Sequence, residues 1–314
     1  MTPELSLRDG GPKDIEPAFA LSQRVGHAAA VRVGIAEGEL PDERIAEAWD
    51  RHHRLLEFLT AQEGARFSVC EEDGELVGFA RVVRFGAMEE LGELVVHPEH
   101  QSRGIGRALL EHIWPGDPTP ELGRSCLAVG TPENLSLTME FGVMPIAGHW
   151  HLLARTDRYR ERRLQERDSA DPGVSALKGD RAAEEWKRLE PLALGYDRAP
   201  LHDFFGRERV CLAAMDLDAG VARSLCWVSS AGDIGPAVGA TAEDLVPVIL
   251  AALDRVASTQ EPEYLRLACT TTSWWVLRRL RRLGFQVVWP AWVMCSVPIP
   301  GLDRYAPSMP PQVL

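Results

Sequence analysis

The stretch with the clearest chemical pattern is LGELVVHPEHQSRGIGRALLEHIW, residues 91–114. It passes from an apolar run through a proline into a glycine-containing loop and then into a helical pattern. Gly104 and Gly106 lack a Cβ and tolerate unusual φ values, so successive main-chain N–H groups can point at one spot. Those amides and the N-terminal dipole of the following helix favour a negative charge. The pattern predicts a pyrophosphate-binding loop over residues 101–107, with arginines at its rim.

Two other kinds of phosphate loop fit these residues less well. A Rossmann fingerprint would need a third glycine where Leu109 stands, and it belongs near the start of a βαβ unit. A P-loop would need a GK[ST] triplet after four residues, and the sequence has none. A structural turn with two glycines and no ligand is the simplest alternative.

A more specific pattern surrounds the two glycines. The spacing V-x-P-x-x-Q-x-x-G-x-G is formed by Val96, Pro98, Gln101, Gly104 and Gly106. This spacing resembles the acetyl-CoA motif of the GNAT N-acetyltransferase superfamily. The other segments of the first half follow in that family's order, so the resemblance covers residues 4–154. A two-domain chain of this length is also similar to tandem GNAT proteins. The resemblance implies an α/β fold with a mixed sheet, repeated in two tandem domains.

The resemblance also implies how acetyl-CoA is bound as a co-substrate. In this family the fourth and fifth strands splay apart, and the pantetheine arm hydrogen-bonds to backbone between them. A backbone N–H of the fourth strand polarises the thioester carbonyl, and an amine held close attacks it directly. The implied cofactor-binding residues are Leu94, Val95, Val96, Gln101, Ser102, Arg103, Gly104, Ile105, Gly106, Arg107 and Asn134.

Glu93 is the candidate general base, because it lies on the fourth strand beside the expected splay. An alkylammonium acceptor with a pKa of about 10 must lose a proton before it attacks, and a carboxylate can take that proton. Glu90, at the start of the same strand, is the rival candidate. An outward-facing Glu93 without a chemical role is the simpler alternative.

The general acid departs from the family pattern. The family has a tyrosine four residues before the glycine that follows the closing helix. If that glycine is Gly142, the position is occupied by Thr138, and residues 115–154 contain no tyrosine. A threonine hydroxyl is a poor acid, although a thiolate whose thiol has a pKa of about 8.5 can leave without one. Thr138 is therefore the candidate by position only, and efficient catalysis is in question.

Two functions remain open on these grounds. The first is an N-acetyltransferase that moves the acetyl group of acetyl-CoA to a primary amine of a small molecule or peptide. The second is a non-catalytic acyl-CoA-binding or regulatory protein that has kept the loop and lost the acid. The acceptor and the oligomeric state are open in both.

The elements that position these residues follow from the hydrophobic pattern. LSLRDG predicts a strand, GPKDIEPAFAL a helix and ELPDERIAEAWDRHHRLLEFLTAQ a second amphipathic helix. ARFSVCEEDGELVGFARVVRF predicts a hairpin, and LGELVV the strand that carries the candidate base. SCLAVG, PENLSLTMEF and MPIAGHWHLLAR then predict a strand, a helix and a closing strand. This alternation is typical of a mixed α/β domain.

A chain of 314 residues is too long for one core, so two domains are expected. We predict a GNAT domain at 1–155, a charged linker at 156–171, a degenerate GNAT-like domain at 172–300 and a proline-rich tail at 301–314 that lies on the surface or frays. In the second half, GPAVGATAED stands where the glycine loop should be, with Glu243 and Asp244 at the helix start. Acidic residues compete with a phosphate for the helix dipole, so we expect one acetyl-CoA per chain.

Composition limits the partners. The net charge of −12 argues against nucleic acid, and no apolar run approaches the roughly 20 residues of a membrane span. The N-terminal residues carry acids and prolines rather than a secretory signal, and the six cysteines are dispersed. We therefore expect a cytoplasmic protein with reduced, buried cysteines.

Four histidines are candidates for lesser roles. His149 and His151 flank Trp150 on one predicted strand, but no third ligand is nearby, so no metal is expected. His52 and His53 lie on the second helix, where they are candidates for lining the acceptor pocket.

Overall fold

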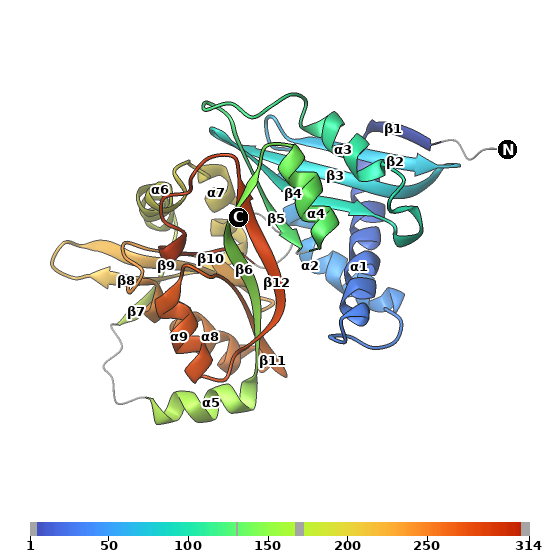
Figure 1. The fold of residues 1–314 in the computed structure, drawn as a ribbon. Helices are drawn as coiled ribbons and strands as arrows, with labels where there is room; N and C mark the ends of the chain where they lie inside the picture. Colours follow the sequence, from blue (N-terminus) through green and yellow to red (C-terminus); the bar gives the residue numbers. More distant parts are fainter. Residues whose placement is uncertain (1–4, 130, 167–172, 309–314) are drawn as a thin grey trace. The chain divides into compact units, whose positions relative to one another are not determined.

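The structure, a computed structural model, describes residues 5–129, 131–166 and 173–308 (Figure 1). Contacts divide the chain into two compact units. Unit 1 comprises Met1–Cys126 and Ser136–Val143, and unit 2 comprises Leu127–Leu135 and Met144–Leu314. The mixed α/β fold expected from the sequence is confirmed in both units. The expected boundary near residue 155 differs from this division, because the closing strand of the first half makes its contacts within unit 2.

Unit 1 contains one mixed sheet. Its strands, in order across the sheet, are β1 (Leu5–Asp9), β2 (Arg66–Glu72), β3 (Glu75–Phe85), β4 (Met88–Val96) and the first residues of β5 (Gly123–Val129). The pairs from β1 to β4 are antiparallel, and β4 pairs with β5 in parallel. The predicted hairpin is the β2–β3 pair, whose turn residues Asp73 and Gly74 have φ of 52° and 84°. Positive φ at both central residues is the backbone of a type I′ turn, which suits the twist of a hairpin.

Helices cover both faces of the unit 1 sheet. The helices associated with this unit are α1 (Ile15–Arg32), α2 (Asp42–Thr60), α3 (Ile105–Ile113) and α4 (Pro132–Glu140), with short 3-10 turns at Pro12–Asp14 and Pro98–His100. Phe19 of α1 and Leu56 of α2 join Phe79 of β3 in one buried cluster. The neighbouring Gly78 faces the other way, where a Cβ would lie 3.2 Å from Ile105 of α3. The loop that precedes α3 is thereby fixed at the end of β4.

Unit 2 contains two groups of strands. One is a five-stranded sheet in the order β13 (Tyr305–Ala306), β10 (Ile234–Gly239), β9 (Val221–Ser229), β8 (Arg209–Asp216) and β7 (Val174–Leu177). In the other, β6 (Met144–Arg155) pairs antiparallel with both β12 (Gln286–Cys295) and β11 (Tyr264–Thr270). Its helices are α5 (Thr156–Gln165), α6 (Asp180–Leu194), α7 (Ala199–Glu208), α8 (Leu245–Thr259) and α9 (Trp274–Arg282), with a 3-10 turn at Leu302–Arg304.

The structure bears on two expectations for the second half. The predicted linker begins as helix α5, while its residues 167–171 lie outside the described residues. The prediction that the tail lies on the surface or frays is wrong for residues 301–308. Leu302, Tyr305 and Ala306 are buried, because the segment forms β13 in the core of unit 2. Residues 309–314 lie outside the described residues.

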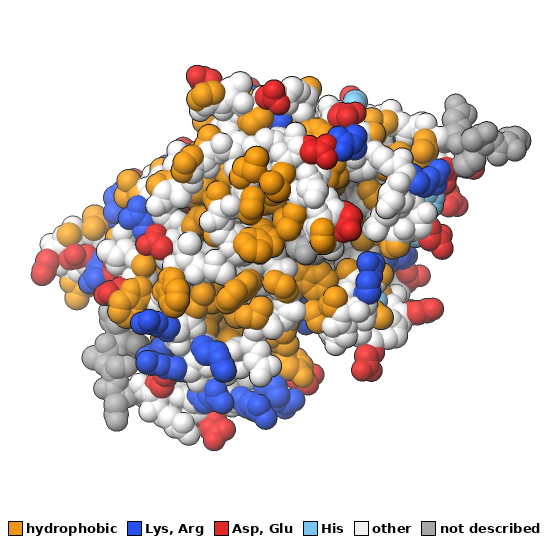
Figure 2. All heavy atoms as spheres, viewed as in Figure 1, with side chains coloured by type: hydrophobic (Ala, Val, Ile, Leu, Met, Phe, Trp, Pro, Cys, Tyr) orange, Lys and Arg blue, Asp and Glu red, His pale blue; other side chains and the backbone are white. Residues whose placement is uncertain are grey.

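The surface of unit 2 shows that net charge is a poor guide to local charge. Figure 2 shows Lys and Arg side chains gathered over the part of unit 2 where Figure 1 draws α5 and α9. The exposed arginines of these two helices are Arg158, Arg160, Arg162, Arg278, Arg281 and Arg282. The exclusion of nucleic acid from the net charge of −12 therefore remains a prediction. No helix among the described residues is both long enough and apolar enough to cross a membrane. All six cysteines are free and buried, as predicted.

Candidate functional site

The edge of β4 that faces β5 is open along half of its length. Among the described residues, the parallel β4–β5 ladder runs from Met88↔Gly123 to Leu91↔Cys126 and ends there. The β3–β4 ladder continues to Gly78↔Val96. Residues 93–96 are thus paired on one edge only, which leaves a row of strand N–H and C=O groups for another chain of amides.

A β-bulge lies where the two strands separate. The β3–β4 register moves from Val82↔Leu91 to Arg81↔Glu93, so Gly92 is an extra residue on β4. A bulge leaves the extra residue unpaired and turns the strand locally. The N–H of Gly92 is therefore removed from the regular ladder at the start of the open edge.

The alternation of the strand decides which backbone groups reach the open edge. The N–H of His97 donates to the carbonyl of Val77 on β3 at 2.8 Å. In an antiparallel pair, residues two apart have the same orientation, so Val95 also directs its N–H and C=O towards β3. Leu94 and Val96 direct theirs away from β3, to the open edge. Of the three strand residues expected to bind the cofactor, these two are suitably oriented and Val95 is not.

Gln101 holds the loop to the end of the strand. Its side-chain Nε2 donates to the carbonyl of Val96 at 3.0 Å. This bond occupies the last carbonyl of the open edge and leaves the Val96 N–H available there. Gln101 therefore positions the loop, and the donor of its side chain is directed at Val96 and not at a phosphate position.

The loop residues have the backbone of an anion site. Ser102 has φ of 62° and Gly104 has φ of 84°, both in the left-handed region. Helix α3 then begins at Ile105 with no side-chain cap and no acidic residue in its first turn. Left-handed residues before an uncapped helix turn successive N–H groups to one side, where an anion satisfies them. Gly106 has a separate role, since a Cβ there would lie 3.3 Å from Leu137 of α4.

Carboxylates neutralise the cations at the rim of the loop. Arg103 lies 2.5 Å from Glu72, and His100 lies 2.7 Å from the other oxygen of the same carboxylate. These hydrogen bonds, that of Arg103 first, lower the pKa of Glu72. Arg107 pairs with Glu140 at 2.6 Å. A phosphate bound in the loop would compete with both carboxylates for the arginines.

Glu93 faces a buried arginine. Its Oε2 lies 3.5 Å from Nη2 of Arg81, whose side chain is 1% exposed. Arg81 also donates to the carbonyl of Leu56 at 3.4 Å, and its guanidinium lies 4.9 Å from the ring centroid of Phe67. Burial lowers the pKa of Arg81, and the charge of Glu93 opposes that effect. Glu93 therefore compensates a buried charge, whatever else it does.

The rival carboxylate, Glu90, is less accessible. Glu90 is 2% exposed, whereas the side chain of Glu93 is 12% exposed. Both lie close to the bulge at Gly92, and Glu93 follows it directly on the open part of the strand. The geometry favours Glu93 as the carboxylate that a bound amine could reach.

Comparison with known proteins agrees with this geometry. Residues 63–127 match the family model of the acetyltransferase (GNAT) domain, which includes the open edge of β4 and the loop. The mycothiol acetyltransferase of Nocardiopsis dassonvillei is 42% identical over 78 residues. That alignment spans 25% of this chain and 23% of the relative, so it covers less than a quarter of the relative's length.

Solved structures extend the likeness to both units. A putative acetyltransferase from Pyrococcus horikoshii has a TM-score of 0.69 at 17% identity, over 96% of this chain and 92% of that chain. A tandem GNAT protein from the clavulanic acid biosynthesis pathway has a TM-score of 0.61 at 18% identity, over 94% and 99%. Residues 63–127 thus match a GNAT domain, and the chain as a whole has the fold of these tandem proteins. At these identities the structural likeness shows the fold alone.

Two residues expected in the GNAT site lie on α4. Thr138, at the position of the family's tyrosine, is 4% exposed within α4. Asn134 is exposed near the start of α4, a helix that the division between the two units crosses. Their roles remain predictions, with burial an argument against Thr138 as an acid.

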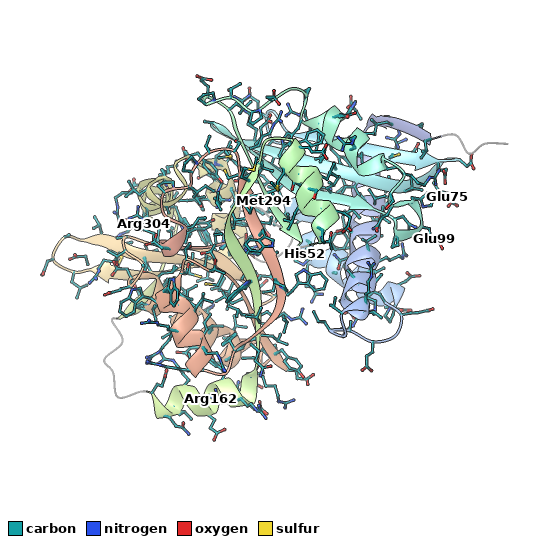
Figure 3. All side chains as sticks on the ribbon, in the orientation of Figure 1. His52, Glu75, Glu99, Arg162, Met294 and Arg304 are labelled. Atoms are coloured by element: carbon teal, nitrogen blue, oxygen red, sulfur yellow. The ribbon has the colours of Figure 1, made fainter. Side chains whose placement is uncertain are left out.

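The four histidines that were candidates for lesser roles lie on α2 and β6. His52, labelled in Figure 3, and His53 lie on α2, with the ring of His52 6.2 Å from that of Phe19. Their place in an acceptor pocket remains a prediction. Burial lowers the pKa of His149 to about 3 and that of His151 to about 4. The described residues contain no cluster of three or more His, Cys, Asp or Glu suited to a metal.

Sequence reasoning missed the bulge and the buried partner of Glu93. The signal for Arg81 was present, because an arginine interrupts the apolar run of GFARVVRF. A buried arginine needs an acidic partner, and the neighbouring strand offers Glu93. The bulge at Gly92 changes the register, so this pairing could not be read from residue counts.

Proposed function

We propose that unit 1 is the acetyl-CoA site of an N-acetyltransferase that acetylates a primary amine of a small molecule or peptide. The observation that supports this most is the open edge at Leu94 and Val96, which leads directly to the uncapped N-terminus of α3. Such an arrangement suits a ligand that carries amides along an extended arm and a pyrophosphate beyond it.

In the proposed complex, the pantetheine amides take the place of the missing ladder partner along β4. The N–H groups of residues 102–107 receive the pyrophosphate, favoured by the dipole of α3. Arg103 and Arg107 exchange Glu72 and Glu140 for phosphate oxygens.

The proposed reaction forms a C–N bond and breaks a C–S bond. The amine nitrogen attacks the thioester carbonyl. As negative charge develops on the carbonyl oxygen, that oxygen accepts a hydrogen bond from the N–H of Gly92. Glu93 takes the proton of the ammonium group, directly or through water, before the attack. Once the C–N bond has formed, the nitrogen loses a second proton to water, which leaves a neutral amide. The electron pair of the C–S bond leaves on sulfur as a thiolate, and a thiol pKa of about 8.5 allows it to leave without an acid.

One observation favours a second candidate, a non-catalytic acyl-CoA-binding or regulatory protein. The position of the family's catalytic tyrosine holds the buried Thr138, and residues 115–154 contain no tyrosine. Such a protein would use the same open edge and loop without transfer of the acetyl group.

Thiol release separates the two candidates. The chain is mixed with acetyl-CoA and a panel of small-molecule and peptide primary amines that includes a mycothiol-type acceptor, since a mycothiol acetyltransferase is among its relatives. We expect thiol release that depends on one class of amine. Tight binding of acetyl-CoA without release for any amine would support the second candidate, and no binding at all would contradict both.

A further inference from the structure

The strand of unit 2 that corresponds to β4 has its open edge filled. In unit 1, β4 pairs with β3 on one edge and is open on the other beyond Leu91. In unit 2, β10 pairs with β9 on one edge and with β13 on the other, at Ala237↔Ala306 and Val238↔Tyr305. The filled edge of β10 faces away from β9, the preceding hairpin strand. In the same way, the open edge of β4 faces away from β3.

The same segment also contacts the end of β11, the strand that corresponds to β5. The carbonyl of Leu302 accepts from Thr270 Oγ1 at 2.8 Å and from Ser273 Oγ at 3.0 Å. The Tyr305 carbonyl accepts from Ser273 Oγ at 3.3 Å. Residues 301–308 therefore lie between the two strands whose counterparts separate in unit 1.

The segment is anchored along its length. Arg304, labelled in Figure 3, donates to the carbonyl of Ala240, which follows β10 directly, at 3.0 Å, and to that of Leu192 at 2.6 Å. The Gly301 N–H donates to Ala193 at 2.8 Å. The side chain of Tyr305 is fully buried. Such anchoring is typical of a built site and not of a loose tail.

The fit is close enough to exclude a side chain at one position. Gly235 of β10 has φ of 114°, and a Cβ there would lie 2.6 Å from the carbonyl oxygen of Pro307. A contact below 3 Å forces something to move, and here the neighbour is backbone.

The helix that follows β10 offers no anion site of the unit 1 kind. Thr241 Oγ1 accepts from the Asp244 N–H at 3.2 Å and donates to the Asp244 carboxylate at 2.8 Å, which closes the turn before α8. A Cβ on Gly239 would lie 2.5 Å from the Thr241 carbonyl oxygen, so the turn is compact. Arg223 pairs with Asp244 at 2.5 Å. Arg223 thus offsets the negative charge of Asp244, which was expected from the sequence to compete with a phosphate for the helix dipole. The closed turn is the stronger obstacle to a phosphate.

We propose that the groove between β10 and β11 is a peptide site occupied in cis by residues 301–308, which take the place that a pantetheine arm takes in unit 1. An extended peptide and a pantetheine arm present amide donors and acceptors of the same kind to a strand edge. The second unit therefore binds no acyl-CoA, and the chain binds one equivalent. The comparison with unit 1 rests on the proposed function, whereas the occupancy of the groove does not.

Hydrogen exchange on the intact chain tests the occupancy and its consequence. Without ligand, we expect the amides of residues 302–306 to exchange as slowly as those of β10, at least about tenfold slower than the exposed turn around Gly220. Saturating acetyl-CoA should slow exchange in residues 94–107 and leave β10 and residues 302–306 unchanged. Faster exchange of residues 302–306 on addition of acetyl-CoA would show displacement and overturn the proposal.

A pair of glycine variants gives the matched control. Gly235→Ala and Gly220→Ala both place a Cβ at positive φ, but only the first meets the segment, because nothing lies within 4 Å of Gly220. We expect Gly235→Ala to speed exchange of residues 302–306 by at least about tenfold over Gly220→Ala. Arg304→Ala, which removes two anchoring bonds without backbone strain, should act in the same direction if Gly235→Ala fails to fold.

Calorimetry separates this proposal from the proposed function. One equivalent of acetyl-CoA in the wild type and in Gly235→Ala supports both. A second equivalent in either chain would overturn the peptide site as a replacement for the cofactor. No heat in either chain, with residues 302–306 still protected, would contradict the function of unit 1 and support the occupancy of the groove.

Discussion

Gly104→Asp tests the phosphate loop most directly. Gly104 has φ of 84° and ψ of −2°, and a Cβ there would meet no atom within 4 Å. A substitution at this position thus acts through backbone strain and charge, without a steric clash. Left-handed backbone costs a non-glycine residue about 1–2 kcal/mol, which either destabilises unit 1 or relaxes the loop.

The charge adds a second effect. A carboxylate about 5 Å from a phosphate charge is repelled by about 0.8 kcal/mol in water, so a pyrophosphate with about two charges is repelled by about 1.7 kcal/mol. That difference corresponds to a roughly tenfold to twentyfold loss of affinity. Gly104→Ala carries the strain without the charge, so the ratio of Kd values for Asp and Ala measures the charge effect alone.

The assay is calorimetric titration with acetyl-CoA at low and at high salt. We expect Gly104→Asp to bind at least about tenfold more weakly than Gly104→Ala at low salt, with the ratio falling at about 1 M salt because exposed charges are screened. Gly34→Asp is the control, since Gly34 also has positive φ and open space but lies after α1. Equal affinities for Gly104→Asp and Gly104→Ala would refute the loop as the pyrophosphate site.

Three further predictions concern carboxylates. Glu93→Gln should lower turnover most at pH below the pKa of the acceptor and leave acetyl-CoA affinity within about twofold, and an unchanged pH–rate profile would move the role to water or another group. Glu72→Gln should free the rim arginine and strengthen acetyl-CoA binding at low salt by about twofold to fivefold, whereas weaker binding would show that Glu72 supports the loop. Glu190→Gln should lower the free energy of unfolding by about 3 kcal/mol or more, because it leaves the buried guanidinium of Arg198 without its charge partner, 2.6 Å away. Burial alone would raise the pKa of Glu190, but its neighbours Arg198 and His202 outweigh burial and lower it to about 2. Its stabilisation is therefore present above about pH 4.5 and lost as the pH falls towards 2, which denaturant melts at several pH values would show against the exposed control Glu184→Gln.

Local patterns in the sequence predicted the parts of the fold that local physics determines. The β2–β3 hairpin was predicted because a two-residue Asp-Gly turn favours positive φ at both positions. The glycine loop was predicted because its left-handed residue and the following helix leave a signature within a few positions. The helices α6 and α7 were not assigned, although Trp186 and Leu189 show a buried face at helical spacing.

Features that depend on pairing between distant segments were not accessible in the same way. The bulge at Gly92 follows from the register between two strands, and a single extra residue leaves the composition of the strand unchanged. The closing strand β6 pairs with β11 and β12, which lie more than a hundred residues further along the chain. A short proline-rich tail has the composition of a loose end, and only its partners on β10 and β11 explain why Tyr305 and Ala306 are buried.

The two units differ in how the hydrogen-bonding groups of one strand edge are satisfied. A strand whose edge faces a widening gap has N–H and C=O groups that must be hydrogen-bonded, because unpaired buried groups cost several kcal/mol. In unit 1 the edge at Leu94 and Val96 has no strand partner, and we propose that a ligand from outside the chain pairs with it beside the uncapped helix α3. In unit 2 the chain itself supplies the partner at Tyr305 and Ala306, and Thr241 closes the turn that would have held the phosphate. A strand edge that is completed by the chain itself gains stability that does not depend on ligand concentration. A strand edge that is left open is stabilised only when a ligand binds to it. On that ground the proposed function places the cofactor in the first unit, and the proposed peptide site of the second unit is filled by residues 301–308 of the chain itself.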